Sequence, residues 1–125
     1  MPVPESTILV VEDETLVRML AVDVLRDAGH TVLEAADGIE ALEILESSGT
    51  DLLITDAEMP RMNGYQLVEA AMTRWPGLKI LLITGYTKEC VPANIVRALS
   101  HTLQKPFDIE RLPGLVAELL GSPSA

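Results

Sequence analysis

The 125-residue sequence has few aromatic side chains and a single cysteine. Aromatic residues make up 3% of the chain, against 48% for all hydrophobic residues, so the core must consist of aliphatic side chains and methionine. The single cysteine, Cys90, cannot form an internal disulfide and leaves no second thiol for a zinc site. We therefore expect a reducing, cytoplasmic location.

Basic residues and long apolar runs are also scarce. Nine Lys and Arg residues against nineteen Asp and Glu residues give a net charge of -10, which disfavours binding to nucleic acid and to anionic membranes. The N-terminus lacks the basic region and apolar segment of a signal peptide, and every apolar run is far shorter than a membrane span. The composition suits a protein that attracts cations or basic partners.

The length fits a single domain over residues 1–125, with a core from about 7 to 120 and frayed ends at 1–6 and 121–125. Short aliphatic runs predict strands at 7–11, 31–35, 51–55, 78–84 and 101–104. Helices are predicted between them: over about 14–28 and 39–47, from the loop with Asn63-Gly64 to about 74, over 92–99, and from Asp108 onward. Gly29 is expected to end the first of these helices, and Asp37 to cap the second. The helical spacing of the first helix predicts an apolar face formed by Val17, Leu20, Val24 and Ala28.

The alternation of strands and helices predicts an α/β fold, in which a five-stranded parallel sheet is covered by helices on both faces. In sheets of this kind, ligands bind in a crevice beyond the C-terminal ends of the strands. The residues that follow the strands are therefore the candidates for chemistry.

Charged and polar residues stand at the C-terminal ends of four of the predicted strands. Glu12 and Asp13 follow the first, Asp56 follows the third, Thr84 is the last residue of the fourth, and Lys105 follows the fifth. Carboxylates gathered at one edge repel each other unless they are neutralised, and oxygen ligands favour Mg²⁺ over Zn²⁺. A hydroxyl and an ammonium beside them suggest a phosphoryl group, accepted by a carboxylate and held by these two donors.

Each of these residues also has an ordinary explanation. Asp13 could cap the first helix, Asp56 could cap a turn, and Lys105 could be a solvated surface lysine. Thr84 is a typical strand residue, and the acidic stretch after the first strand could be a solvated face. The coincidence of all these residues at one edge of the sheet favours a functional site.

The chain resembles the receiver domains of bacterial response regulators from about residue 7 to residue 120. The similar segments are Ile8-Leu9-Val10-Val11-Glu12-Asp13, Asp56-Ala57-Glu58-Met59-Pro60, Asn63-Gly64, Thr84-Gly85 and Lys105-Pro106-Phe107. The resemblance implies a doubly wound, flavodoxin-like sheet of strand order 2-1-3-4-5. It also implies a cis peptide bond between Lys105 and Pro106.

The resemblance further implies that Asp56 is the phosphoacceptor and that Thr84 and Lys105 contact the phosphoryl oxygens. Its Mg²⁺ ligands would be Glu12, Asp13, Asp56 and the backbone carbonyl of Glu58. A histidine kinase or a histidine phosphotransfer protein would supply the phosphoryl group, and phosphorylation would switch interactions with a downstream protein. Such a domain is no conventional enzyme, since it catalyses only its own Mg²⁺-dependent phosphorylation and slow autodephosphorylation. We expect no nucleic-acid or membrane partner, and a monomer or weak dimer.

Two other functions stay open on the sequence. An aspartate-nucleophile phosphatase carries an acid two residues after its nucleophile, where Glu58 stands, although Met59-Pro60 fits a receiver domain better. An interaction module that works without phosphorylation is the second, and the intact Asp56 and Lys105 argue against it.

The sequence departs from the receiver pattern at three places, one of which is Leu99-Ser100-His101, where the small Gly-Ala pair common before the fifth strand is missing. Thr102 stands three residues before Lys105, where the family usually has Tyr or Phe. Either the switch is carried differently, with a contribution from Tyr86, or little is transmitted through that face. Pro113 interrupts the last helix, which predicts a first turn from Asp108 and a restart at Pro113.

Overall fold

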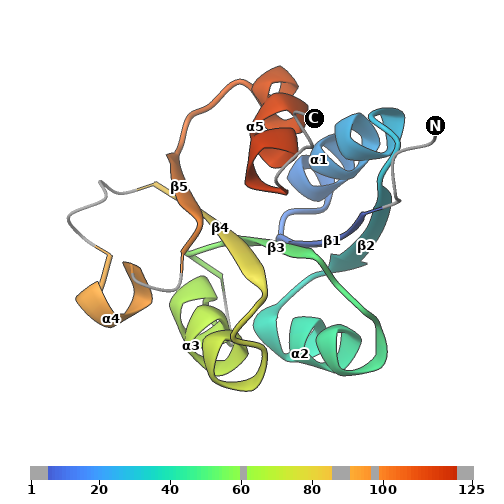
Figure 1. Cartoon of the computed structure of the whole chain (residues 1–125). Coiled ribbons are helices and arrows are strands. Elements are labelled where there is room, and N and C mark those ends of the chain that lie inside the picture. Colours follow the sequence, from blue (N-terminus) through green and yellow to red (C-terminus); the bar gives the residue numbers. More distant parts are fainter. Residues whose placement is uncertain (1–5, 60–61, 86–90, 97–98, 121–125) are drawn as a thin grey trace.

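The computed structural model describes residues 6–59, 62–85, 91–96 and 99–120, and strands and helices alternate along them (Figure 1). The strands are β1 (Thr7–Val11), β2 (Thr31–Ala35), β3 (Leu52–Asp56), β4 (Lys79–Thr84) and β5 (His101–Gln104). The helices are α1 (Thr15–Asp27), α2 (Gly38–Ser47), α3 (Gly64–Arg74), α4 (Ala93–Val96) and α5 (Leu112–Leu119), with a short 3-10 helix η2 (Ile109–Arg111) before α5.

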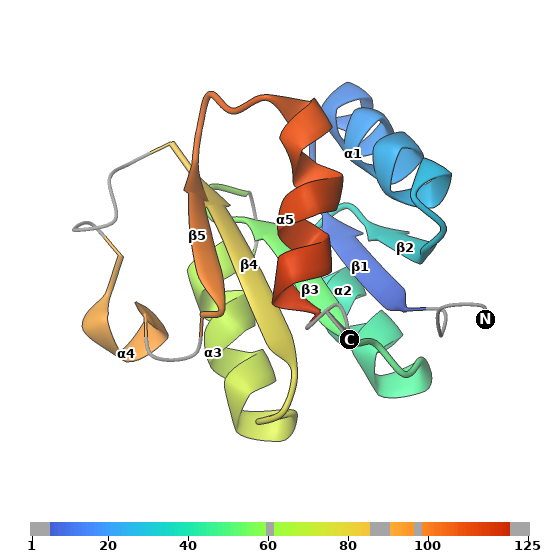
Figure 2. The ribbon, with the colours of Figure 1, turned by 45° about the horizontal axis from the view of Figure 1, so that its top comes forward.

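The five strands form one parallel sheet in the order β2-β1-β3-β4-β5, which confirms the expected fold class and strand order. Helices α1 and α5 cover one face of the sheet, and α2, α3 and α4 lie on the other (Figures 1 and 2). The central strands β1, β3 and β4 are buried along almost their whole length because both of their faces are covered.

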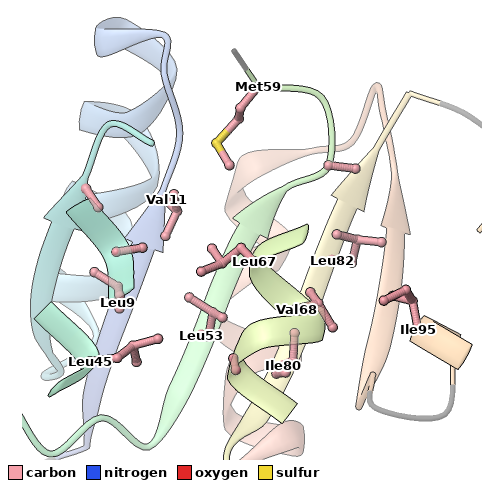
Figure 3. Close-up of a cluster of buried hydrophobic side chains, with 14 of the residues drawn as sticks. Leu9, Val11, Leu45, Leu53, Met59, Leu67, Val68, Ile80, Leu82 and Ile95 are labelled. Atoms are coloured by element: carbon pink, nitrogen blue, oxygen red, sulfur yellow. The ribbon is translucent and has the colours of Figure 1, made fainter. Parts of the chain in front are cut away.

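Two hydrophobic clusters hold the helices on the sheet. Successive side chains of a strand point to opposite faces, so Leu9 and Leu53 pack under α2 and α3 (Figure 3), while Ile8 and Leu52 pack under α1 and α5. Each of these side chains is fully buried and contributes roughly 1.5–3 kcal/mol to the stability of the sheet. The core therefore fixes the strand ends, where the candidate residues stand.

Helix boundaries follow the capping residues that the sequence predicts. The Asp37 side chain accepts a hydrogen bond from the Glu40 N–H at 2.9 Å and begins α2. Gly29, at φ +99°, follows α1 in a left-handed conformation that favours glycine. Both predictions are confirmed.

Helix α1 buries a different face from the one predicted. The structure buries Ala21, Val22 and Leu25, whereas Val17 and Leu20 are exposed. The reason is that α1 is apolar on more than one side, so periodicity alone could not decide which set of residues packs on the sheet. Ala28 is exposed as well and Val24 is half-buried, so the predicted stripe was wrong at three of its four residues.

The C-terminal segment is interrupted as predicted. Asp108 accepts a hydrogen bond from the Glu110 N–H at 3.0 Å and begins η2, and α5 then starts at Leu112 with Pro113 in its first turn. Proline is tolerated there because the first turn of a helix needs no backbone donor. The peptide bond between Lys105 and Pro106 is cis, which confirms that expectation too.

Some predictions fall partly or wholly outside the described residues. The helix expected over 92–99 is described over Ala93–Val96, and residues 97–98, Tyr86, Cys90 and most of the expected frayed ends lie outside. Strand β3 starts and ends one residue later than predicted. Within the described ranges, no helix has the length and apolar character needed to cross a bilayer.

Candidate functional site

The acidic residues meet because β1 and β3 are neighbours in the sheet. Val11 pairs with Thr55, so Glu12 and Asp13, just after β1, lie beside Asp56 at the end of β3. One carboxylate oxygen from each of these three residues lies within 4.8 Å of the other two. Asp56 is 3% exposed and Glu12 7%, whereas Asp13 faces solvent. The predicted convergence of the three carboxylates is therefore confirmed.

The ammonium group of Lys105 approaches this cluster from the other side. The Lys105 N–H donates to the Thr84 carbonyl at 2.8 Å, which keeps the residue in line with the sheet after β5 ends. Its Nζ then donates to Oδ2 of Asp56 at 3.0 Å. The Glu58 N–H donates to Oδ1 of the same carboxylate, also at 3.0 Å. Both oxygens of Asp56 thus accept a hydrogen bond.

The loop after β3 is held against the sheet by a glycine. The Gly64 N–H donates to the Ala57 carbonyl at 3.0 Å, and a Cβ on Gly64 would lie 2.2 Å from the carbonyl oxygen of Asp56. No other residue fits such a close backbone approach without displacing the end of β3. The Asn63 side chain accepts from the Gln66 N–H at 2.9 Å and starts α3 at this point.

Thr84 ends β4 and is fully buried, and its hydroxyl donates to Oε2 of Glu58 at 2.8 Å. The Gly85 N–H donates to Oε1 of the same carboxylate at 2.9 Å. From the sequence, the Glu58 backbone carbonyl was expected at the metal and its side chain was expected to tune water access, but its bond to Thr84 was not predicted. The one signal available was an acidic residue two positions after Asp56. The Mg²⁺-ligand role of the Glu58 carbonyl stays a prediction.

The electrostatics of the cluster shift two pKa values. Burial raises the pKa of the Glu12 carboxyl to about 7; the Glu14 N–H, which donates to it at 3.1 Å, opposes this shift, and the negative charge of Asp56 adds to it. Burial lowers the pKa of the Lys105 ammonium, but its hydrogen bond to Asp56 and the surrounding carboxylates outweigh this effect and raise it. Lys105 therefore stays protonated.

The donor set fits a hard divalent cation. Glu12, Asp13 and Asp56 offer carboxylate oxygens only, and the single ammonium of Lys105 does not balance their charge. Burial is the main cause of the raised pKa of Glu12, and the negative charge of Asp56 adds to it, an effect that a bound cation would relieve. Oxygen ligands of this kind suit Mg²⁺ better than Zn²⁺.

Comparison with known proteins agrees with this geometry. A family model described as the response regulator receiver domain matches residues 8–117. The chain belongs to the response regulator receiver domain family. This receiver is also 39% identical over 118 residues to "Sensor kinase CckA" of Brucella abortus, and the match covers 92% of this chain and 12% of that protein.

Two further relatives are of similar length to this receiver. "Response regulator receiver protein CpdR" of Brucella abortus is 33% identical, with 90% of this chain and 95% of that protein covered. The crystal structure of response regulator protein TrrA from Thermotoga maritima, in complex with Mg²⁺ and BeF, superposes with a TM-score of 0.82 at 31% identity, covering 91% of this chain and 98% of that one. The receiver fold thus occurs both alone and as a small part of longer proteins.

The receiver is a phosphoacceptor signalling domain rather than a classical enzyme. The phosphatase and the phosphorylation-independent module that the sequence left open are not favoured. Thr102 lies half-buried in β5, where the family usually has an aromatic residue, whereas Tyr86, the residue expected to compensate, lies outside the described part of the chain.

Proposed function

We propose that Asp56 accepts a phosphoryl group from a phosphohistidine of a histidine kinase or phosphotransfer protein, in a Mg²⁺-dependent reaction. The observation that supports this most strongly is the position of Asp56. Its buried carboxylate lies where the acidic cluster meets the Lys105 ammonium. The Mg²⁺ ligands would be Glu12, Asp13, Asp56 and the Glu58 backbone carbonyl.

In this reaction a carboxylate oxygen of Asp56 attacks the phosphorus atom, the O–P bond forms, and the P–N bond to the donor imidazole breaks. A loose transition state needs positioning and charge neutralisation more than acid-base chemistry. Lys105 donates to the Asp56 carboxylate and would donate to a phosphoryl oxygen on it. The Thr84 hydroxyl would hold another of these oxygens, and Mg²⁺, when bound, supplies positive charge to the carboxylates and the phosphoryl group.

We further propose that the phosphodonor docks over the N-terminal half of α1. Leu16, Val17, Met19 and Leu20 are exposed there, with Leu16 69% and Leu20 49% exposed. A mainly apolar pocket of about 350 Å³ joins Val17 and Leu20 to Asp56 and Lys105. A protein that covers this surface would bring its phosphohistidine directly to the acceptor.

The same role applies whether the domain works alone or within a longer protein. We propose one domain over residues 1–125, a cytoplasmic location, a monomeric or weakly dimeric state, an unidentified downstream protein partner, and no binding to nucleic acid or membranes. The net charge of -10 supports the last point.

Incubation with acetyl phosphate and Mg²⁺, followed by intact mass measurement and peptide mapping, tests the acceptor. We expect one phosphoryl group per chain, on Asp56, with no labelling when a chelator removes the metal. Asp56→Asn should fold, as judged by circular dichroism, and take no label. Labelling of the folded Asp56→Asn variant to the wild-type level would refute the assignment.

A further inference from the structure

The Glu58 side chain joins the loop after β3 to the end of β4. One oxygen of its carboxylate accepts from the Thr84 hydroxyl at 2.8 Å, and the other accepts from the Gly85 N–H at 2.9 Å. The Thr84 side chain is fully buried, whereas Glu58 is exposed to solvent. An exposed carboxylate thus binds a buried hydroxyl beside the acceptor.

The bond to Glu58 conflicts with the role proposed for Thr84. A hydroxyl carries one proton and donates one hydrogen bond at a time. The Thr84 hydroxyl therefore cannot donate to Glu58 and to a phosphoryl oxygen on Asp56 at once. Both acceptors are anionic oxygens, so both bonds are charge-assisted and of comparable strength.

We propose that Glu58 is a positioning residue that holds Thr84 and the end of β4 in the unphosphorylated arrangement and competes with the phosphoryl group for the Thr84 hydroxyl. The inference rests on the proposed function. Phosphorylation has to displace the Glu58 carboxylate from Thr84, and the Gly85 N–H loses the same partner when the carboxylate leaves. The exchange couples the chemistry at Asp56 to the backbone after β4.

Glu58 has a second effect, because its negative charge reaches the site. It is one of the carboxylates that raise the pKa of Lys105, and it adds to the repulsion that an incoming phosphoryl group meets. A variant without Glu58 therefore changes both the hydrogen bond and the charge. The two effects differ in one respect: only the first depends on the Thr84 hydroxyl.

The test measures binding of beryllofluoride, a mimic of the phosphoryl group, to the full chain in saturating Mg²⁺. The variants are Glu58→Ala, Thr84→Val and the double substitution. Glu58→Ala should bind beryllofluoride on the order of tenfold more tightly than wild type, because a charge-assisted hydrogen bond no longer opposes binding. In the Thr84→Val background, the same substitution should change the affinity by less than about twofold.

Two further variants sharpen the result. Glu58→Gln keeps the size of the side chain and weakens the hydrogen bond, so its affinity should fall between wild type and Glu58→Ala. Glu43→Ala removes an equal charge from the exposed face of α2 and should change the affinity by less than about twofold. The backbone amide signal of Gly85 should move in the same direction in Glu58→Ala as it does when wild type binds beryllofluoride.

The possible results distinguish a failure of the competition for Thr84 from a failure of the proposed function. If wild type binds no beryllofluoride in Mg²⁺, the proposed function fails. If wild type binds it, but Glu58→Ala is no tighter or is tighter by the same factor in both backgrounds, only the competition for Thr84 is refuted. Equal factors would mean that Glu58 acts through its charge.

Discussion

At the scale of single residues, Glu12 and Asp56 show how two neighbouring buried carboxylates can differ. Asp56 has a donor on each oxygen, from Lys105 and from the Glu58 N–H. Glu12 accepts from the Glu14 N–H, but it lies 7% exposed against the charge of Asp56. Burial and this charge raise the pKa of Glu12, the proposed metal ligand.

The raised pKa of Glu12 predicts how stability depends on pH. Without metal, the folded state holds this proton up to a pH of about 7, whereas a free carboxyl loses it near 4.5. The stability that this group contributes is therefore fully present below pH 4.5 and is lost as the pH rises to about 7. We expect the free energy of unfolding of wild type, relative to Glu12→Gln, to fall by on the order of 1–3 kcal/mol across this window.

Urea unfolding in a chelator, at a pH below and a pH above this window, measures the difference between the two proteins. Other carboxylates titrate in both and cancel. Addition of Mg²⁺ should stabilise wild type more at the higher pH, because the cation binds the ionised carboxylate. A wild-type-minus-Glu12→Gln difference that stays the same at both pH values would contradict the raised pKa.

At the scale of elements, the junction of β3 and α3 sets the position of Asp56. Gly64→Ala would place a Cβ 2.2 Å from the Asp56 carbonyl oxygen, so the end of β3 or the start of α3 must move. We expect a loss of about 1–3 kcal/mol in the free energy of unfolding. Phosphorylation by acetyl phosphate should slow as well.

Gly49→Ala is the matched control for this substitution, since a Cβ at Gly49 meets nothing within 4 Å. Urea unfolding of both variants gives the comparison. Equal stability of Gly64→Ala and Gly49→Ala would show that the close approach at Gly64 does not constrain the site.

The exposed apolar residues of α1 lead to a prediction about phosphorylation by a protein donor. Leu16→Arg replaces a 69% exposed leucine with a charged residue and should leave the fold intact. If the phosphodonor docks there, the substitution should lower the phosphorylation rate at least about tenfold more with a protein donor than with acetyl phosphate. Equal losses with both donors would place the docking surface elsewhere.

The elements were largely predictable from sequence, and the contacts between them were less so. Short, β-branched runs such as Thr7–Val11 favour strands buried on both faces, and Asp37 and Gly29 mark helix ends by their own local chemistry. The face of α1 was predicted wrongly because Ala21 and Leu25 compete with Val17 and Leu20 at the same helical period. Periodicity cannot choose between two apolar stripes; only packing does.

The candidate site was also predictable only in part. The residues at the strand ends were predictable because parallel strands bring their C-termini to one edge. The bond between Thr84 and Glu58 was not, since it joins side chains 26 positions apart in the sequence and depends on how the loop after β3 turns. The role of Thr102 without an aromatic ring is still a prediction, as is the part of Tyr86.

At the scale of the whole molecule, one edge of the sheet combines a rigid backbone with a cluster of negative charges. Two layers of helices bury the sheet and fix the strand ends, while the net charge of -10 and the acidic cluster favour binding of a cation at that edge. The same edge adjoins the exposed end of α1, so the proposed acceptor, the proposed metal ligands and the proposed docking surface lie together.

A crystal structure of the chain with Mg²⁺ and beryllofluoride tests the central claim most directly. We expect beryllium bonded to a carboxylate oxygen of Asp56, Lys105 in contact with a fluorine, and Mg²⁺ bound by Asp13 and Asp56 with Glu12 beside it. Beryllofluoride on another residue, or Mg²⁺ bound away from these carboxylates, would contradict the account.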